Sequence, residues 1–487
     1  MTSSSKPPPK KNIISKSKTI SKKNENKKPT VGLGIMQEDD IDKLLESVRK
    51  NYRVRCASTF FYPYNLFSNY VMGDSRFNNK NQLIRIYKKQ TRVFEHGHIC
   101  FSLIKSGNKY LKRSVFIKEL PCMDYEVRTH ELDKFYQMDA CFPNIHGNLI
   151  MKNLYSYSNP SYIDVLCHYL CSRVVEEGIL PHFPLYYGVI TTMFDKFSYT
   201  FTDKEDYMNY ITRHHLKRGY KDHQLKIINK DDKDKVEFTN FPVCLMATEV
   251  IDFDLDEFLM NINATFEKLS DEFKVEEFEQ TLMSILFQTT VALSYIQSEW
   301  NMIHNDLHIG NIMLKYTDQQ YINYSIKGNY YRVPSNGMIV KIIDWNRATL
   351  TYNSKQINNS VYFCGGECAD MYFFPTHLQN KKPTIEANPS FDLALLAFEI
   401  LNNDKVMNKK NSKVVKLLMS WLNTDSGDNV FTQLGGTEED EAGFELYQSI
   451  AAECHKAVPS QQIPKNIWNG FKVSKSAIPE NEHIYTI

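Results

Sequence analysis

The sequence has 487 residues, which exceeds one average domain and suits a two-part protein with additional segments. With 42% hydrophobic and 13% aromatic residues it can bury a full core, and its formal net charge of +1 excludes a global preference for nucleic acid. No apolar run approaches the roughly 18 residues of a membrane helix. The first residues form no apolar signal segment, and the ten cysteines follow no secreted-domain spacing. We therefore expect an intracellular protein with reduced thiols and no membrane span.

The first 30 residues are rich in lysine. They hold nine Lys and one acid, Glu25, together with short runs of Ser and Pro. Such a composition cannot bury enough surface to offset the entropy of the chain, so it predicts a disordered basic tail. A solvated tail is the simpler interpretation, and a nuclear-import or nucleic-acid-binding arm is the functional one. Residues 31–90 follow as an extension of unassigned role, with a short helix predicted over 39–50.

A strand pair and a helix are predicted next. Residues 99–104 and 115–118 are rich in β-branched and aromatic side chains, and Gly107 lies in a turn between them. This pattern predicts a β-hairpin. A helix is predicted from Pro160 to about Glu177, because proline favours the first helical turn and a glycine follows the end.

The remainder of the chain contains mostly helical patterns. Residues 195–240 are charged and are interpreted as a surface insertion, and 243–246 as a buried strand. Apolar residues follow helical spacing over 278–296, and 391–402 is a second strongly apolar helix. The order of strands, one helix, strands and then helices predicts an α+β fold with a small β-rich lobe and a larger helical lobe.

Two motifs carry the chemistry. In His304-Asn305-Asp306-Leu307-His308-Ile309-Gly310-Asn311, an Asp precedes an Asn by five residues, and Asp344 then follows a strand-like apolar run. Phosphoryl transfer needs one carboxylate to orient the attacking hydroxyl, and an amide oxygen and a second carboxylate to hold the magnesium ions. Each residue alone could be an ordinary polar residue of a turn. Their order and spacing together favour catalysis.

In these motifs the sequence resembles the protein-kinase-like superfamily, over roughly residues 90–405. Within it, the chain is most similar to the divergent serine/threonine protein kinases of large DNA viruses, including the poxvirus virion type. The resemblance implies a two-lobed fold with an N-terminal lobe over 91–251 and a C-terminal lobe over 252–487. It also implies ATP with Mg²⁺, or Mn²⁺ in its place, protein substrates, and a location in the host cytoplasm or the virion.

The resemblance assigns roles to four residues of the catalytic centre. Asp306 is the catalytic base, or the residue that positions the substrate hydroxyl. Asn311 and Asp344 are the metal ligands. Lys118 ends a Val-x-Ile-Lys run and matches the lysine that contacts the α- and β-phosphates. The alternative for Lys118 is an exposed lysine of a strand.

Further residues match the parts of the family that bind the nucleotide. Gly97 resembles the last glycine of the phosphate-covering loop, with Ile99 at the valine position, although a simple turn explains Gly97 nearly as well. Thr248-Glu249-Val250-Ile251 resembles the hinge that meets adenine. By that pattern, backbone groups of Glu249 and Ile251 would form hydrogen bonds with the base.

Two carboxylates are expected to support the site. Asp164 is the first choice for the helix residue that pairs with Lys118, and Glu176 and Glu177 lie later on the same helix. Asp392 resembles the aspartate that braces the catalytic loop through its backbone amides. Its alternative role is to interact favourably with the dipole at the start of its own helix.

Three departures from the family pattern leave alternatives open. Asn305 stands where many kinases have Arg, which weakens the need for phosphorylation of the activation loop. His308 replaces a lysine, and the resulting Asp-Leu-His-x-Gly-Asn also resembles aminoglycoside and choline kinases. Trp345 replaces the Phe of Asp-Phe-Gly. A small-molecule kinase and a pseudokinase scaffold are therefore the alternatives to a serine/threonine protein kinase.

Overall fold

The computed structural model describes residues 36–59, 61, 80–94, 97–122, 156–200, 225–230, 233–266, 271–362, 368, 371–372, 388–403, 406, 412–435 and 439–487. The chain divides into two compact units, residues 1–32 and 33–487, and every described residue belongs to the second. The Lys-rich residues 1–30 lie outside the described residues, so their contact with nucleic acid stays a prediction.

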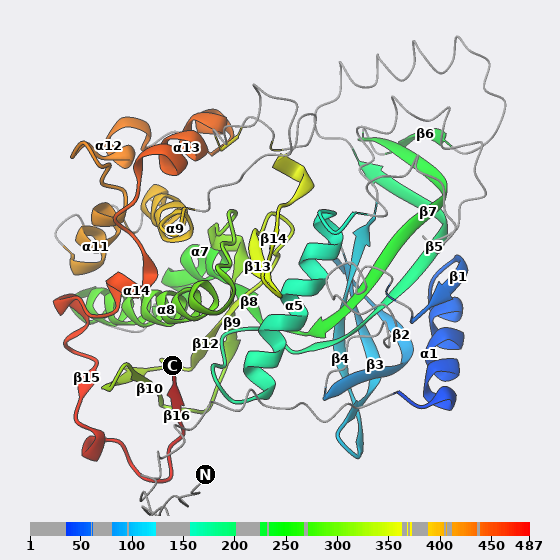
Figure 1. Cartoon of the computed structure of the whole chain (residues 1–487), viewed down its shortest axis with the longest axis horizontal. Helices are drawn as coiled ribbons and strands as arrows, with labels where there is room; N and C mark the ends of the chain where they lie inside the picture. The colour runs from blue at the N-terminus through cyan, green and yellow to red at the C-terminus, as the bar shows by residue number, and fades with distance from the viewer. Residues whose placement is uncertain are drawn as a thin grey trace, which may run out of the picture. The chain divides into compact units, whose positions relative to one another are not determined.

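A seven-stranded antiparallel sheet forms the β-rich lobe. Its strand order is β1-β5-β7-β4-β3-β2, with β6 paired to β7. Helices α1 and α5 accompany this sheet, and in Figure 1 α5 runs between the sheet and the helices of the second lobe. The elements of the lobe are α1 (Glu38–Asn51), β1 (Val54–Ser58), β2 (Asn81–Phe94), β3 (Gly97–Ser106), β4 (Lys109–Pro121), α5 (Pro160–Glu176), β5 (Tyr186–Thr200), β6 (Leu225–Lys230) and β7 (Lys233–Glu249).

The predicted hairpin and helix of this lobe are confirmed. Strands β3 and β4 pair in antiparallel register, and Gly107 at their turn has a φ of +57°, which glycine adopts without steric cost. Helix α5 begins after Asn159, whose side chain accepts a hydrogen bond from the backbone N–H of Ser161. Gly178 just beyond the helix has a φ of +73°.

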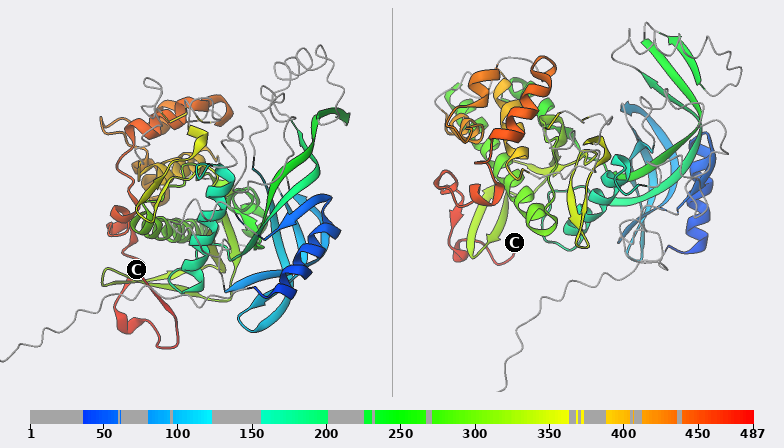
Figure 2. Two further views of the ribbon diagram at one scale, coloured as in Figure 1. Left: turned by 45° about the vertical axis from the view of Figure 1, so that its right-hand side comes forward. Right: turned by 45° about the horizontal axis from the view of Figure 1, so that its top comes forward.

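The β-rich lobe begins earlier than the sequence analysis places it. Strands β1 and β2, which precede residue 91, belong to the same sheet, and the turned views in Figure 2 also show α1 beside it. The edge of β2 is covered by α1, because Ile86 donates its N–H to Ser47 Oγ and its carbonyl accepts from Asn51 Nδ2. Residues 31–90 are therefore partly an integral piece of this lobe.

The predicted charged insertion at 195–240 has a regular framework. Its first residues continue β5 and its last residues belong to β7, and the two strands pair from Tyr186 with Thr248 to Thr200 with Lys235. Strand β6 pairs in antiparallel register with the first part of β7, from Leu225 with Phe238 to Lys230 with Lys233. Residues 201–224 lie outside the described residues.

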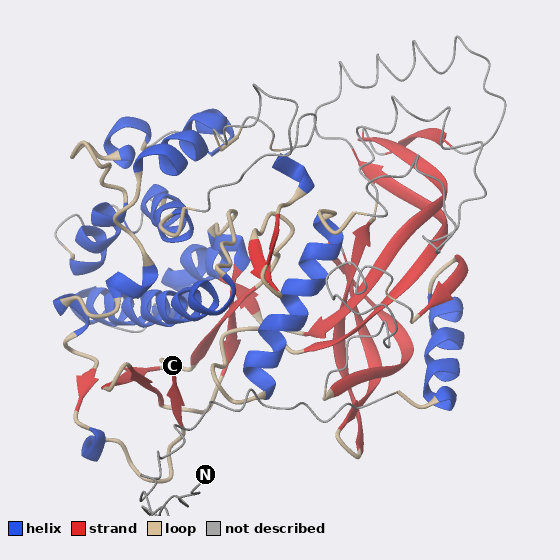
Figure 3. Cartoon of the chain, viewed as in Figure 1, coloured by secondary structure: helices blue, strands red, loops and turns tan. Residues whose placement is uncertain are grey.

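The second lobe is mainly helical, as Figure 3 shows by the helices gathered on the far side of α5 from the large sheet. The predicted helices at 278–296 and 391–402 fall within α8 and α9, and the α+β two-lobed fold is confirmed. Most residues of α9 are apolar and buried, which is typical of a helix in the centre of a lobe. The helices are α7 (Leu255–Phe266), α8 (Asp271–Trp300), α9 (Phe391–Asn402), α11 (Lys413–Trp421), α12 (Val430–Leu434), α13 (Glu439–Glu453) and α14 (Pro459–Gln462).

Small sheets complete this lobe. A three-stranded sheet has the order β12-β9-β8, a four-stranded sheet the order β15-β11-β10-β16, and β13 pairs with β14. No described helix combines the length and apolar character that a membrane crossing requires. The strands are β8 (Phe253–Asp254), β9 (Ile312–Tyr316), β10 (Tyr321–Ile326), β11 (Asn329–Pro334), β12 (Met338–Ile342), β13 (Leu350–Tyr352), β14 (Lys355–Ile357), β15 (Lys472–Val473) and β16 (Ile484–Thr486).

Candidate active site

Lys118 connects three parts of the chain. It lies in β4, and its Nζ atom is 2.9 Å from Asp164 Oδ2 in α5 and 2.9 Å from Asp344 Oδ1 just after β12. The other two candidates for its helix partner point elsewhere. Glu176 accepts hydrogen bonds from the backbone of residues 80 and 81, and Glu177 pairs with an arginine of its own helix. The structure therefore joins Lys118 with Asp164, the first choice of the sequence analysis.

Lys118 and its carboxylate partners stabilise one another in their ionised forms. Burial alone would lower the pKa of Lys118, but the carboxylates of Asp164 and Asp344 outweigh burial and raise that pKa above its usual value. Burial alone would raise the pKa of Asp164, and Lys118 and His168 instead hold it below its usual range. Asp164 also accepts the backbone N–H of Trp345 at 2.8 Å. The lysine and its helix partner are therefore both ionised at neutral pH.

The loop from His304 to Asn311 is braced from helix α9. The backbone N–H groups of His304 and Asn305 donate to the two oxygens of Asp392 at 3.0 and 2.9 Å, so the predicted bracing contact is present. Asp392 is fully buried, and burial raises its pKa to about 7 despite these two donors. The His304 ring lies 2.8 Å from the carbonyl of Ile343, and burial lowers its pKa to about 4. His304 is thus a neutral structural residue.

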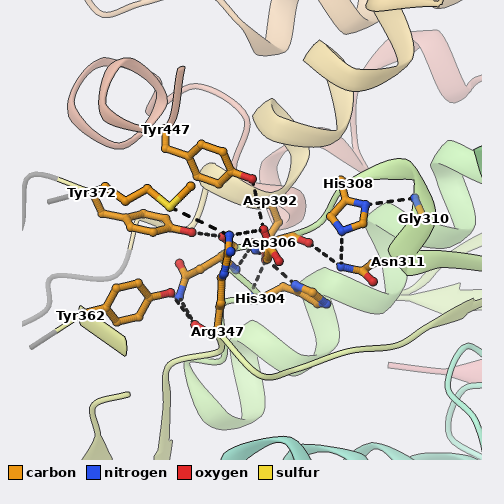
Figure 4. Close-up of polar contacts among 12 residues, drawn as sticks. His304, Asp306, His308, Gly310, Asn311, Arg347, Tyr362, Tyr372, Asp392 and Tyr447 are labelled. Atoms are coloured by element: carbon orange, nitrogen blue, oxygen red, sulfur yellow. Dashed lines mark hydrogen bonds and ion pairs between the residues drawn. The ribbon is translucent and has the colours of Figure 1, made fainter. Parts of the chain in front are cut away.

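The carboxylate of Asp306 is held on one side by residues that the sequence analysis did not identify. Arg347 Nη1 lies 2.8 Å from Asp306 Oδ1, and the hydroxyl of Tyr447 in α13 donates to the same oxygen at 3.2 Å. Figure 4 shows both side chains converging on Asp306, with His308 turned toward Gly310. Within the described part of the chain, the Oδ2 atom of Asp306 takes no hydrogen bond.

Asn311 is held in one orientation. It ends the short 3₁₀ turn η1 (Ile309–Asn311), and its Nδ2 atom donates to the carbonyl of Asp306 at 2.8 Å and lies 2.9 Å from His308 Nε2. His308 Nδ1 in turn accepts the N–H of Gly310 at 3.2 Å. Because the NH₂ group is used internally, the amide oxygen of Asn311 is the atom left to bind a ligand.

The donor atoms suit a hard divalent cation. The amide oxygen of Asn311 and the carboxylate of Asp344 are oxygen donors, which Mg²⁺ prefers. Among the described residues, no group of three or more His, Cys, Asp or Glu side chains is placed to hold a metal on its own. Mg²⁺ commonly combines one or two protein oxygens with substrate phosphates, so the oxygens of Asn311 and Asp344 could hold it.

Two residues of the site have left-handed backbone conformations. Asn305 has a φ of +63° and Asp344 a φ of +64°. Asn and Asp tolerate this region better than other side chains, although it remains uncommon for them. Such backbone is concentrated at functional sites, where the surrounding structure holds it in place. The types of residue at these two positions therefore suit the local backbone as well as the chemistry.

Gly97 is required by a close approach between strands. It begins β3, directly opposite Lys118 of β4, and a Cβ atom at this position would lie 2.6 Å from the carbonyl oxygen of Ile117. Ile99 lies two residues further along β3, on the same face of the strand. The structure thus places Gly97 at the end of the hairpin next to Lys118, and contact of Gly97 and Ile99 with a nucleotide stays a prediction.

In the predicted hinge, the side chain of Glu249 forms ion pairs within the protein. Glu249 ends β7, and its carboxylate pairs with Lys315 and lies 3.5 Å from Lys341. Burial would raise the pKa of Glu249, but these two lysines lower it. The backbone N–H of Glu249 donates to the carbonyl of Leu185 at 2.8 Å, so this group is engaged within the protein. Ile251 lies in the connection after β7, and its contact with adenine stays a prediction.

The sequence gives only a partial signal for Arg347 and none for Tyr447. Arg347 comes three residues after Asp344, where a charged residue close to a metal ligand could have been singled out. Tyr447 lies in α13, about 140 residues from Asp306 in the chain, and its contact depends on how α13 packs. Neither residue belongs to the motifs on which the prediction of the site was based.

Comparison with known proteins identifies several partial relatives. No protein-family model matches the chain. Mouse serine/threonine-protein kinase haspin is 36% identical over 70 residues, which is 14% of this chain and 9% of haspin. R301 of Acanthamoeba polyphaga mimivirus, a candidate serine/threonine-protein kinase by its name, is 23% identical over 192 residues, or 38% of this chain and 46% of R301. The chain thus spans less than half the length of these relatives.

A third relative and one solved structure extend the comparison. The serine/threonine-protein kinase haspin homolog of Drosophila melanogaster is 26% identical over 148 residues, which is 30% of this chain and 24% of the homolog. ROP2 from Toxoplasma gondii, described as a virulence factor with a protein-kinase fold and no enzymatic activity, aligns over 90% of both chains at 11% identity with a TM-score of 0.35.

Proposed function

We propose that this divergent protein-kinase-like protein transfers the γ-phosphate of ATP to serine or threonine hydroxyls of proteins. The observation that carries the proposal is the position of Lys118, 2.9 Å from both Asp164 and Asp344. A cation placed beside a partly exposed carboxylate is the arrangement that phosphoryl transfer uses to hold nucleotide phosphates and a metal ion together. The curated relatives, which are named serine/threonine-protein kinases, support the choice of acceptor.

Each residue of the site would have a separate role in phosphate transfer. Lys118 would hold the α- and β-phosphates, and Gly97, opposite it in the hairpin, would allow the backbone to approach them. The amide oxygen of Asn311 and the carboxylate of Asp344 would hold Mg²⁺ or Mn²⁺, which offsets the charge of the phosphates when it is bound. Asp306 would orient the acceptor hydroxyl and accept its proton through Oδ2.

Two other functions are each favoured by one observation. The Asp-Leu-His-x-Gly-Asn variant, in which His308 replaces a lysine, is also typical of aminoglycoside and choline kinases, so a small-molecule acceptor is the first alternative. Arg347 occupies one oxygen of Asp306, which would suit a pseudokinase scaffold whose aspartate has a structural role. The fold by itself does not distinguish these functions.

The test is phosphate transfer with matched variants. Purified protein is incubated with γ-labelled ATP, Mg²⁺, acidic and basic protein substrates, and a panel of amino alcohols and aminoglycosides. We expect label on Ser or Thr of a protein, and at least about a hundredfold lower transfer by Asp344→Ala, which lacks a metal ligand. Asp318→Ala, which changes an exposed aspartate beyond β9, is the control and should transfer normally.

The alternative outcomes separate the three functions. Label found only on small molecules would replace the protein acceptor by a small-molecule acceptor. A thermal shift with ATP and Mg²⁺ without transfer to any acceptor would favour the scaffold, because a ligand that binds the native state raises its stability. Normal transfer by Asp344→Ala would refute the assignment of Asp344 as a metal ligand.

A further inference from the structure

Both contacts to the Asp306 carboxylate reach the same oxygen. Arg347 Nη1 lies 2.8 Å from Oδ1, and the Tyr447 hydroxyl donates to Oδ1 at 3.2 Å. These contacts come from two different elements, the segment after Asp344 and helix α13. They leave Oδ2 open within the described part of the chain. A carboxylate held through one oxygen presents the other in a defined direction.

Arg347 and Tyr447, which contact Asp306, are themselves fixed in position by hydrogen bonds or burial. The carbonyl of Arg347 accepts hydrogen bonds from the Tyr362 hydroxyl at 2.6 Å and from Asn305 Nδ2 at 3.1 Å. Tyr362 and Tyr447 are almost fully buried, so neither ring can turn freely. The Arg347 side chain is 19% exposed and that of Asp306 is 13% exposed. This ion pair is therefore more shielded from water than an ordinary surface pair.

Arg347 also supplies a positive charge next to Asp306. Asn305 and His308, which flank Asp306 in the sequence, stand where the family pattern has cations, and the amide of Asn305 carries none. Among the described residues, Arg347 is the one Lys or Arg that forms an ion pair with Asp306. An ionised carboxylate beside a transferred phosphate meets repulsion, which a guanidinium at this distance would offset.

We infer that Arg347, supported by Tyr447, is a positioning residue that holds Oδ1 of Asp306 and directs Oδ2 at the acceptor hydroxyl. This inference rests on the proposed function, because it assigns a role in phosphate transfer. It predicts that loss of Arg347 slows the chemical step and leaves ATP binding intact, since its contact is with Asp306 and not with Lys118.

The experiment compares turnover and ATP dependence in a set of variants. Arg347→Met removes the charge and the donors, and we expect a kcat about 10- to 100-fold lower, the range of a lost charge-assisted hydrogen bond. The KM for ATP should stay within about twofold. Arg347→Lys keeps the charge and should recover part of kcat, and Tyr447→Phe should lower kcat by only a few-fold. Arg332→Met is the control, because Arg332 forms a 2.8 Å ion pair with Glu482 at a similar exposure of 21%.

Each outcome decides between defined alternatives. No transfer by the wild-type protein would overturn both the proposed function and this inference. Normal wild-type transfer with an unchanged kcat in Arg347→Met would overturn the inference alone, as would a faster variant, which would make the contact inhibitory. A raised KM for ATP with unchanged kcat would assign Arg347 to the nucleotide instead. If Arg347→Met does not fold, the kcat values of Arg347→Lys and Tyr447→Phe decide.

Discussion

The two carboxylates that flank Lys118 differ in their contact with water. The Asp164 side chain is fully buried, whereas that of Asp344 is 29% exposed. Removing one partner of a buried ion pair costs about 3–5 kcal/mol, because it leaves an uncompensated buried charge. Partly exposed pairs contribute about 1 kcal/mol or less. Asp164 should therefore hold Lys118 in the fold, and Asp344 should be the partner that can exchange it for a ligand.

This difference gives a prediction for stability. Lys118→Met should lower the free energy of unfolding by about 3 kcal/mol, because Asp164 is left buried without its cation. Asp344→Ala should lower it by about 1 kcal/mol or less. Adding Asp164→Asn to Lys118→Met should cause little further loss, since the unpaired charge is then gone. Urea unfolding measures all three, and equal losses in Lys118→Met and Asp344→Ala would contradict the argument.

At the scale of the elements, the segment after Asp344 is tied to the catalytic loop by neutral groups in addition to the Arg347–Asp306 ion pair. Asn305 Nδ2 donates to the carbonyl of Arg347 at 3.1 Å and lies 3.2 Å from Thr349 Oγ1. The backbones of Ile303 and Thr349 exchange two hydrogen bonds of 3.0 Å. No charge takes part in these contacts. Among the described residues, these contacts join the two segments without a phosphate group.

We accordingly predict that activity does not depend on phosphorylation. Treatment with a phosphatase, followed by its removal, should leave turnover within about twofold, with dephosphorylation verified by mass spectrometry. Asn305→Gly should lower turnover by about tenfold, because glycine fits the φ of +63° and removes the amide that ties the two segments. A collapse of activity after phosphatase treatment would show that a phosphate group is required after all.

How well the elements could be predicted depended on the regularity of their patterns. Helix α9 is strongly apolar, and the alternation around Val115 and Ile117 fits a strand, so both elements were predicted. Strand β2 was missed, because its pairing with β3 is interrupted at three places between Leu83 and Val93. Such bulges break the period of two on which strand prediction depends.

The site could be predicted only where its residues are close in the sequence or match a family motif. Asp306 and Asn311 lie in one short loop, and resemblance alone connected Lys118 with Asp164. The contacts of Arg347 and Tyr447 with Asp306 depend on the packing of segments far apart in the chain. No local pattern encodes such packing.

At the scale of the whole described unit, the two lobes are joined by a buried histidine. His182, between α5 and β5, lies 2.7 Å from the Tyr324 hydroxyl in β10 and 3.2 Å from the Val340 carbonyl in β12. Its own carbonyl accepts the N–H of Ile342. A second link lies beside it, since Lys341 Nζ donates to the carbonyl of Phe183 at 2.9 Å. The chain that enters β5 is thereby fastened to the second lobe.

The imidazole of His182 is neutral at neutral pH, because burial lowers its pKa. Nδ1 must carry the proton to donate to the Val340 carbonyl, so Nε2 accepts from the Tyr324 hydroxyl. Burial lowers the pKa of His182 to about 3, against about 6.5 in an unfolded chain. Between these values the unfolded state binds a proton and the folded state does not. The contribution of His182 to stability is therefore complete above pH 6.5 and is lost progressively as the pH falls toward 3. His304, whose pKa burial lowers to about 4, acts in the same direction.

The prediction is a pH-dependent free energy of unfolding that His182→Asn weakens. Asparagine can still donate to the Val340 carbonyl but does not titrate, so the variant is less stable at pH 7.5 yet loses less on acidification. Between pH 6.5 and 4.5, the wild-type protein should lose about 2 kcal/mol more than the variant, close to the limit for one proton over two pH units. Urea unfolding at four pH values measures this, with the exposed His483→Asn as control. Parallel losses in the wild-type protein and His182→Asn would show that His182 takes up its proton equally in the folded and unfolded states, which would contradict its lowered pKa.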